Sequence, residues 1–340
     1  MPMMRIALDA MGGDHGPEVT IPAALAALQR YPAVTFSLIG DQPTISHLLK
    51  RAGADTARCS VVHAPQRVEM TDRPSSALRS KRESSMRFAL DLVRDGQADA
   101  CVSAGNTGAL MAMARYVLKT LPGIDRPAIC AMLPSVNGST HMLDLGANVD
   151  SSSEELFRFA VMGSVLAASI DDRSNPRVAL LNIGEEEIKG NDRVKQTAML
   201  LEQSKLNYCG FAEGNDIYTG KFDVIVCDGF VGNVALKASE GVAGMLLELA
   251  RQEFRRSIFT KLSALLAAPV LRRLRDRADP RRYNGASLLG LRGIVIKSHG
   301  SADVFSFGRA IDQAVLEMQN AVPDRISSEL EQFLINDPLT

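Results

Sequence analysis

Short apolar and β-branched runs alternate with longer helical patterns along almost the whole chain. The run Val224–Cys227 is apolar at every position and Val178–Ile183 is nearly so, which is the composition of strands buried on both faces of a sheet. Strands that alternate with helices indicate a parallel sheet with crossover helices. We therefore predict an α/β fold, a doubly wound three-layer αβα sandwich, with ligands beyond the carboxyl ends of its strands.

The expected elements follow this alternation. We predict strands at 5–9, 34–39, 59–63, 99–103, 127–133, 140–145, 176–183, 223–227 and 293–297, and helices near 18–30, 42–52, 80–95, 107–120, 153–170, 191–206, 231–262 and 302–320. A chain of 340 residues is long enough for one large domain, and no low-complexity linker or internal repeat divides it. We predict a single domain over 1–340, with a helical insertion at 245–285.

Composition limits the function and the location. The formal net charge is −1, so no overall field attracts nucleic acid. The five cysteines form no CxxC pattern and most lie in apolar runs, which indicates buried, reduced thiols. The five histidines show no ligand spacing, so we expect no metal site. Since the N-terminus reads as a strand and no run of eighteen apolar residues occurs, we expect a cytoplasmic protein, at most peripheral to a membrane.

Five strand ends lead into turns rich in glycine and asparagine: Asp9–Pro17, Ser103–Gly108, Asp144–Asn148, Gly184–Asn191 and Asp228–Asn233. Glycine lets the backbone turn sharply or approach a ligand. Each turn opens a helix whose first N–H groups lack partners and attract an anion, and asparagine adds neutral donors. One such turn is more often an ordinary loop or helix cap, but five in one sheet favour an anion site in a shared crevice.

Two side chains near these turns have competing interpretations. Lys189 lies on a loop that leads into a helix, where a lysine is usually solvent-exposed. Here it is also within reach of the same crevice, and its ammonium would neutralise part of a phosphate dianion. His15 follows Gly12 and Gly13, and serves either as a proton donor or as a cap of the first helix.

Several catalytic motifs are absent from the sequence. There is no GxxxxGK[ST] loop, so nucleoside triphosphate hydrolysis is not expected. The GxGxxG fingerprint does not follow the first strand, and no GxSxG elbow or cysteine–histidine pattern suggests an acyl-enzyme.

The ordered set of motifs resembles the bacterial phosphate acyltransferase family of phospholipid synthesis. The match extends from about residue 4 to 320 and rests on Asp9–Asp14, Ser103–Ala109, Leu143–Asn148, Leu181–Asn191, Asp228–Val234 and Gly285–Gly290. The resemblance implies an isocitrate dehydrogenase/phosphate acetyltransferase-like fold. It also implies transfer of a long-chain acyl group from acyl carrier protein to inorganic phosphate. The acyl phosphate would then serve a membrane glycerol 3-phosphate acyltransferase.

The resemblance further implies a homodimer that needs no metal or organic cofactor, and active-site roles for Lys189 and Asn233. From the residues themselves we add Asn106, Thr107 and Gly108, at the start of a helix, as phosphate ligands. We assign the same role to the turn that contains Gly12, Gly13 and His15. Phosphate is already an anionic nucleophile, so the enzyme must hold it close to the thioester carbonyl and stabilise the oxyanion that forms, through backbone N–H groups or Asn233.

The insertion at 245–285 has a strong local charge. Residues 251–282 contain ten lysines and arginines but only three acids. Apolar residues recur at helical spacing before and after Pro269, which we expect to break the run. This pattern fits a helical hairpin on an anionic membrane surface, with Phe254, Ile258, Leu262 and Leu265 as the contacts. A pair of helices that packs in the dimer, or a docking surface for acidic acyl carrier protein, explains the same pattern.

Three other functions compete with the acyltransferase. A metal- and NAD-dependent decarboxylating dehydrogenase would need clustered aspartates, and outside the acidic loops the chain offers the adjacent pair Asp171 and Asp172. A phosphate acyltransferase acting on coenzyme A thioesters of short acids would differ in chain length and carrier. A non-catalytic membrane scaffold would explain the insertion but leave the five turns without a purpose.

Overall fold

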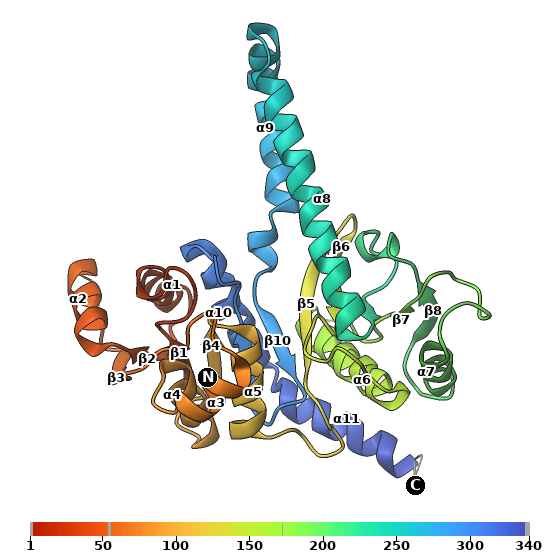
Figure 1. The fold of residues 1–340 in the computed structure, drawn as a ribbon, viewed down its shortest axis with the longest axis horizontal. Coiled ribbons are helices and arrows are strands. Elements are labelled where there is room, and N and C mark those ends of the chain that lie inside the picture. Colours follow the sequence, from red (N-terminus) through yellow and green to blue (C-terminus); the bar gives the residue numbers. More distant parts are fainter. Residues whose placement is uncertain (1–2, 54–55, 172, 337–340) are drawn as a thin grey trace.

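The computed structural model describes residues 3–53, 56–171 and 173–336, and its centre is one sheet of eleven strands (Figure 1). The strand order is β3-β2-β1-β4-β11-β10-β5-β6-β9-β7-β8. The strands are β1 Met4–Asp9, β2 Val34–Gly40, β3 Cys59–His63, β4 Ala100–Ser103, β5 Ala128–Ser135, β6 Gly138–Leu143, β7 Val178–Leu181, β8 Tyr208–Ala212, β9 Val224–Val226, β10 Ala286–Leu289 and β11 Ile294–Lys297.

The sheet is mixed, which differs from the parallel sheet that the sequence predicted. β3, β2, β1, β4 and β11 are parallel to one another, and so are β6, β9, β7 and β8. Between these groups, β10 is antiparallel to β11 and β5, and β5 is antiparallel to β6. β5 and β6 form a hairpin with a short turn, which antiparallel pairing allows. The two parallel groups therefore run in opposite directions within the sheet.

Helices cover both faces and complete three layers. The helices are α1 Pro17–Arg30, α2 Gln42–Ala52, α3 Pro74–Ser80, α4 Ser85–Arg94, α5 Thr107–Leu118, α6 Ser153–Ile170, α7 Asp192–Glu202, α8 Gly229–Arg255, α9 Ile258–Ala278, α10 Val304–Gln319 and α11 Val322–Asn336. On β1, Ala7 belongs to the core under α4 and α5, whereas Ile6 and Leu8 face α1 and α10. This alternation is the period of two expected of a strand buried on both faces, and it confirms the predicted layered α/β fold.

Among the described strands and α-helices, four were not predicted from the sequence: β8, β10, α3 and α11. β8 and β10 have five and four residues, and glycine either lies inside the run or bounds it, as Gly210, Gly285 and Gly290 do. Such short runs carry too little periodicity to be recognised before their neighbours in the sheet are known.

The basic insertion forms a hairpin of α8 and α9 that projects away from the sheet (Figure 1). Pro269 does not break it, because α9 continues through this residue to Ala278. The predicted helix at 231–262 is divided, since α8 ends at Arg255 and Ser257 caps the start of α9. Along the described residues, no helix combines the length and the hydropathy needed to cross a membrane.

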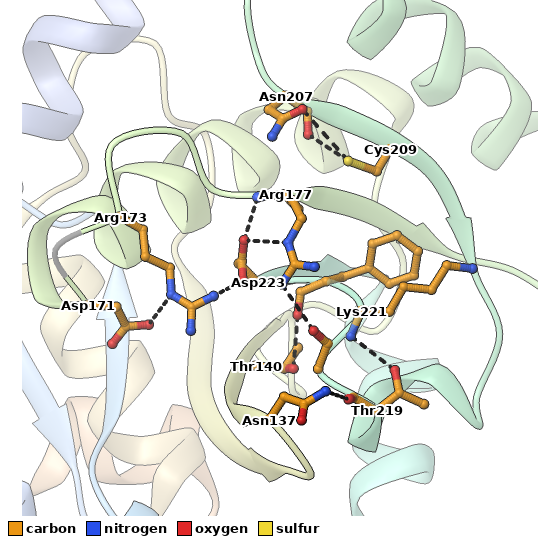
Figure 2. Close-up of polar contacts among 12 residues, drawn as sticks. Asn137, Thr140, Asp171, Arg173, Arg177, Asn207, Cys209, Thr219, Lys221 and Asp223 are labelled. Atoms are coloured by element: carbon orange, nitrogen blue, oxygen red, sulfur yellow. Dashed lines mark hydrogen bonds and ion pairs between the residues drawn. The ribbon is translucent and has the colours of Figure 1, made fainter.

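A buried charge network holds the amino ends of β7 and β9 together (Figure 2). Asp223, 4% exposed, accepts hydrogen bonds from the backbone N–H of Arg177 at 2.8 Å and from its Nε at 3.0 Å. It is also paired with Arg173, which contacts Asp171 in turn. This carboxylate is saturated by protein donors at the strand ends opposite to those that carry the glycine turns. We therefore interpret the network as a structural anchor.

A second buried acid makes stability depend on pH. Glu317 of α10 lies under β10, where it is hydrogen-bonded to Ser287 and accepts from Gln313 Nε2 at 3.0 Å. Burial raises the pKa of Glu317 to about 7 from an ordinary value of 4.5. Between these values the folded protein holds a proton that the unfolded chain has lost, so stability is greatest below about pH 4.5 for this group and declines as the pH rises to 7.

We expect Glu317→Gln to remove this dependence. The wild-type protein should lose on the order of 3 kcal/mol more of its free energy of unfolding than the variant does between about pH 5 and about pH 8. Urea denaturation of both proteins at the two pH values measures the difference. An equal pH dependence in the two proteins would contradict the assignment.

Candidate active site

The first group of turns lies at the carboxyl ends of β1, β4 and β11, which we call the first edge. Pairing places Asp9, Ser103 and Lys297 level with one another on these three strands. Ser103 Oγ donates to Asp9 Oδ2 at 2.7 Å, and Ser85 Oγ of α4 donates to Asp9 Oδ1 at 2.6 Å. Burial raises the pKa of Asp9, while these hydroxyls oppose the shift. Asp9, Ser103 and Lys297 thus form a polar row that is buried below the glycine turns.

The turns of the first edge interlock closely. Gly13 has a φ of +85°, and a Cβ there would lie 2.8 Å from the carbonyl oxygen of Gly300 and 2.9 Å from Ala104 Cβ. The next residue, Asp14, donates its N–H to that same carbonyl at 2.9 Å. Gly12 and the exposed His15 border a small hollow with Ala104 and Gly300. Glycine is therefore required at position 13 both for its conformation and for the close approach of the loop after β11.

The third part of the first edge is the start of α5. Asn106 caps this helix, since its Oδ1 accepts from Ala109 N at 2.9 Å, and its Nδ2 donates to the carbonyls of Met70 and Asp72 at 2.7 and 3.1 Å. Its side chain is therefore a cap, not the free amide donor that the sequence suggested. Thr107 and Gly108 are exposed at the first two helical positions, where backbone N–H groups have no partner within the helix.

The second group of turns lies at the carboxyl ends of β6, β9 and β7, which we call the second edge. Asp144 organises it by accepting from the backbone N–H groups of Ile129, Ala147 and Asn148 at 3.0, 3.0 and 2.7 Å. Asn233, the fifth residue of α8, is exposed and faces Gly146, where a Cβ would lie 3.5 Å from that of Asn233. Asp228 caps α8 by accepting from Val231 N at 2.9 Å.

Lys189 belongs to the second edge. It lies on the loop between β7 and α7, its side chain is 43% exposed, and its Nζ is 2.7 Å from Glu186 Oε2. The hydrogen bond to Glu186 raises the pKa of Lys189. The stem of the side chain lies over Gly184, where a Cβ would be 2.3 Å from Lys189 Cδ. Asn191, which follows, caps α7 by accepting from Val194 N at 3.0 Å.

The structure therefore divides the predicted site residues between two edges. The first edge brings together Gly12, Gly13, His15, Asn106, Thr107 and Gly108, and the second edge carries Lys189 and Asn233. We expected all five turns to border one crevice because we predicted a parallel sheet, in which the carboxyl ends of all strands lie at the same edge. The three antiparallel pairings between β11 and β6 place the carboxyl ends of the two groups at opposite edges of the sheet.

Sequence reasoning missed three residues of the first edge: Asp9 as a buried acid, Ser103 and Lys297. Lys297 is the last residue of the apolar run Ile294–Lys297. A charged residue at the end of a buried strand is the sequence feature that could have identified it as a candidate site residue. Its burial, at 7% exposed, came only from the structure.

The three buried cysteines lack the properties of a nucleophile. Cys101, Cys130 and Cys227 are buried, and burial raises the pKa of all three thiols, so they remain protonated. Cys209 is exposed, unlike the buried thiols that we expected. Of the pair considered for a dehydrogenase metal site, Asp171 is hydrogen-bonded to His141 at 2.9 Å, and Asp172 lies outside the described residues.

The architecture is an α/β fold similar to that of the phosphotransacetylases. A phosphotransacetylase from Streptococcus pyogenes superposes with a TM-score of 0.62 at 17% identity, over 93% of this chain and 94% of the other. A family model described as "Fatty acid synthesis protein" matches residues 4–325.

Two relatives named phosphate acyltransferase align along nearly the full chain. The protein of Alkalilimnicola ehrlichii is 61% identical over 97% of each chain, and that of Halorhodospira halophila is 59% identical over the same shares. The chain belongs to this fatty acid synthesis protein family. The resemblance inferred from the motifs is therefore confirmed, and so is the assignment to the acyltransferases.

Proposed function

We propose that this chain transfers a long-chain acyl group from acyl carrier protein to inorganic phosphate, and that the acyl phosphate supplies a membrane enzyme that acylates glycerol 3-phosphate. The name of its relatives, at 59–61% identity over 97% of the chain, is the observation that most directly supports phosphate as the acceptor. The first edge supports it independently, because it offers backbone N–H groups at a helix start to an anion.

The transfer needs no covalent enzyme intermediate. An oxygen of phosphate attacks the thioester carbonyl carbon, the carbon–sulfur bond breaks, and the carrier leaves as a thiolate that takes up a proton. The protein holds phosphate in position and stabilises the oxyanion on the carbonyl. We assign phosphate binding to the turn at Gly12, Gly13 and His15 and to the start of α5. We assign the transfer step to Lys189 and Asn233.

Both edges act on one substrate pair if the twist of the sheet turns them toward each other. Successive strands rotate by about 20–25°. Six pairings separate β1 from β9, so the accumulated rotation is roughly 120–150°. The carboxyl ends of the two parallel groups, opposed within a flat sheet, then point in directions much closer to each other. Phosphate at the first edge and the thioester near Asn233 would meet in the space between them.

The direct test is to incubate the protein with a long-chain acyl carrier protein thioester, with and without inorganic phosphate, and to trap acyl phosphate with hydroxylamine. We expect hydroxamate to form only when phosphate is present. A parallel reaction with short-chain coenzyme A thioesters separates the second candidate function. Faster turnover of those thioesters, or no hydroxamate from either substrate, would reject the proposed reaction.

We also propose a homodimer in which the α8 helices meet. An apolar stripe on α8 is between 42% and 54% exposed and recurs at helical spacing: Val231, Val234, Val242, Met245 and Leu249. A stripe of this kind along a projecting helix is suited to pack against the same helix of a second copy. The arginines of α9 remain on the surface, where they would attract the acidic acyl carrier protein.

The tip of the hairpin is the proposed contact with the anionic inner face of the cell membrane, which gives a cytoplasmic, peripherally bound enzyme. Ile258 and Phe259 are both 83% exposed, and Leu262 and Leu265 are 56% and 70% exposed. Phe254 is less exposed. Apolar side chains flanked by arginines bind at the boundary between headgroups and acyl chains.

We expect the double variant Ile258→Asp, Leu262→Asp to lose binding to anionic vesicles, because it places two carboxylates where apolar side chains enter the lipid. Flotation with vesicles rich in anionic lipid measures the bound fraction. A matched control, Val149→Asp and Met199→Asp, changes two apolar side chains that are 73% and 53% exposed outside the hairpin and should float as the wild type does. Undiminished flotation of the hairpin variant would reject the membrane contact.

A further inference from the structure

A lysine is buried beneath the first edge, on the face of the sheet that α4 and α5 cover. Lys297 is 7% exposed and ends β11, level with Ser103 on β4. Val295, two residues earlier on β11, belongs to the core under α4 and α5, and side chains two apart on a strand share a face. Lys297 Nζ donates to the carbonyl oxygen of Ala104 at 3.3 Å. The ammonium therefore lies beside Ala104, which precedes the first residue of α5 by three positions.

Among the described residues, no carboxylate forms a hydrogen bond or an ion pair with this ammonium. Its hydrogen bonds go to the backbone carbonyl oxygens of Ala104 and Ser298. Asp9, in the same row, is engaged instead by the hydroxyls of Ser85 and Ser103 and by backbone N–H groups. Burial lowers the pKa of Lys297 to about 8, as expected for an ammonium removed from water, while the charges of Asp9 and Asp14 oppose this shift.

The position suits an anionic ligand better than a structural role alone. An ammonium has three N–H donors, and the two hydrogen bonds to carbonyls leave one. A buried charge is stabilised when an opposite charge and further hydrogen bonds accompany it. Thr107 and Gly108 are exposed at the first two positions of α5, three and four residues after Ala104, and the N–H groups at such a helix start attract an anion.

We propose that Lys297 is the cation of the phosphate site, and that phosphate binds between its ammonium and the backbone N–H groups at the start of α5. The inference rests on the proposed function for the identity of the anion. It replaces Lys189 as the phosphate-binding lysine, because Lys189 belongs to the second edge and is paired with Glu186.

The test compares Lys297→Met with Lys297→Gln. Both variants lose the charge, but the amide of glutamine still donates hydrogen bonds to carbonyl oxygens. We expect both to raise the KM for phosphate at least tenfold, about 1.4 kcal/mol, while the KM for the acyl carrier thioester stays unchanged. Calorimetric titration of the protein with inorganic phosphate alone should show the same weakening. A folded Lys297→Gln protein with the wild-type affinity for phosphate would overturn the proposal.

A second variant keeps the proposal testable if the Lys297 variants do not fold. Thr107→Asp puts a carboxylate at the first position of α5, where it stabilises a helix but repels a bound phosphate. Gln42→Asp makes the same kind of change at the first, exposed position of α2 and is the matched control. We expect a loss of phosphate affinity of at least tenfold in Thr107→Asp and wild-type affinity in the control. Unchanged affinity in Thr107→Asp would also overturn the proposal.

The proposed function fails separately. A wild-type protein that forms no acyl phosphate, yet binds inorganic phosphate in a manner weakened by Lys297→Gln, would reject the acyl transfer and retain the anion site.

Discussion

Lys189→Ala is expected to reduce acyl phosphate formation by about 10²–10³-fold, the effect of removing one preorganised donor from a transition state. Lys189 is exposed and its contact with Glu186 is a surface ion pair, so the loss of the side chain should leave folding intact. The measurement is the initial rate of hydroxamate formation at saturating phosphate and thioester. Circular dichroism and the midpoint of urea unfolding verify that the variant is folded.

Lys221→Ala is the matched control. This lysine is 49% exposed and is paired with Glu185 at 2.5 Å, next to the glutamate that contacts Lys189. It removes the same charge from a neighbouring loop, and its rate should stay within about twofold of the wild type, as for surface changes away from a site. A Lys189→Ala protein as active as this control would exclude Lys189 from the transfer step.

Asp223→Ala is expected to lower the free energy of unfolding by about 3 kcal/mol, because it leaves the arginines of a buried network without their shared partner. Its side chain is 5% exposed, while those of Arg173 and Arg177 are 32% and 42% exposed (Figure 2). These arginines regain some water in the variant, so the estimate is at the low end for a buried ion pair. Urea denaturation monitored by circular dichroism gives the value.

The comparison for Asp223 is Asp125→Ala. Asp125 pairs with Arg158 at 2.5 Å, but its side chain is 71% exposed, and such surface pairs contribute about 0–1 kcal/mol. If both variants lose the same stability, burial does not set the strength of the Asp223 network.

The residues of the glycine turns were predictable because their signal is local. A glycine that must have a positive φ, such as Gly13, and an asparagine that opens a helix, such as Asn191, act within a few residues of the chain. The same locality explains an error in interpretation. A cap and an anion donor have the same sequence pattern, and Asn106 proved to be a cap whose amide is bound to Met70 and Asp72.

The sequence by itself determined the alternating α/β architecture, the family, and which turns carry the glycine and asparagine residues, because each depends on short-range patterns or on ordered motifs. Tertiary structure alone decided that these turns occupy two edges, since strand direction follows from pairings between distant segments such as β10 with β5. It also decided that Lys297 is buried. A lysine at a strand end has the same sequence whether it meets water or lies under a helix, and the packing of α4 and α5 over β11 makes that choice.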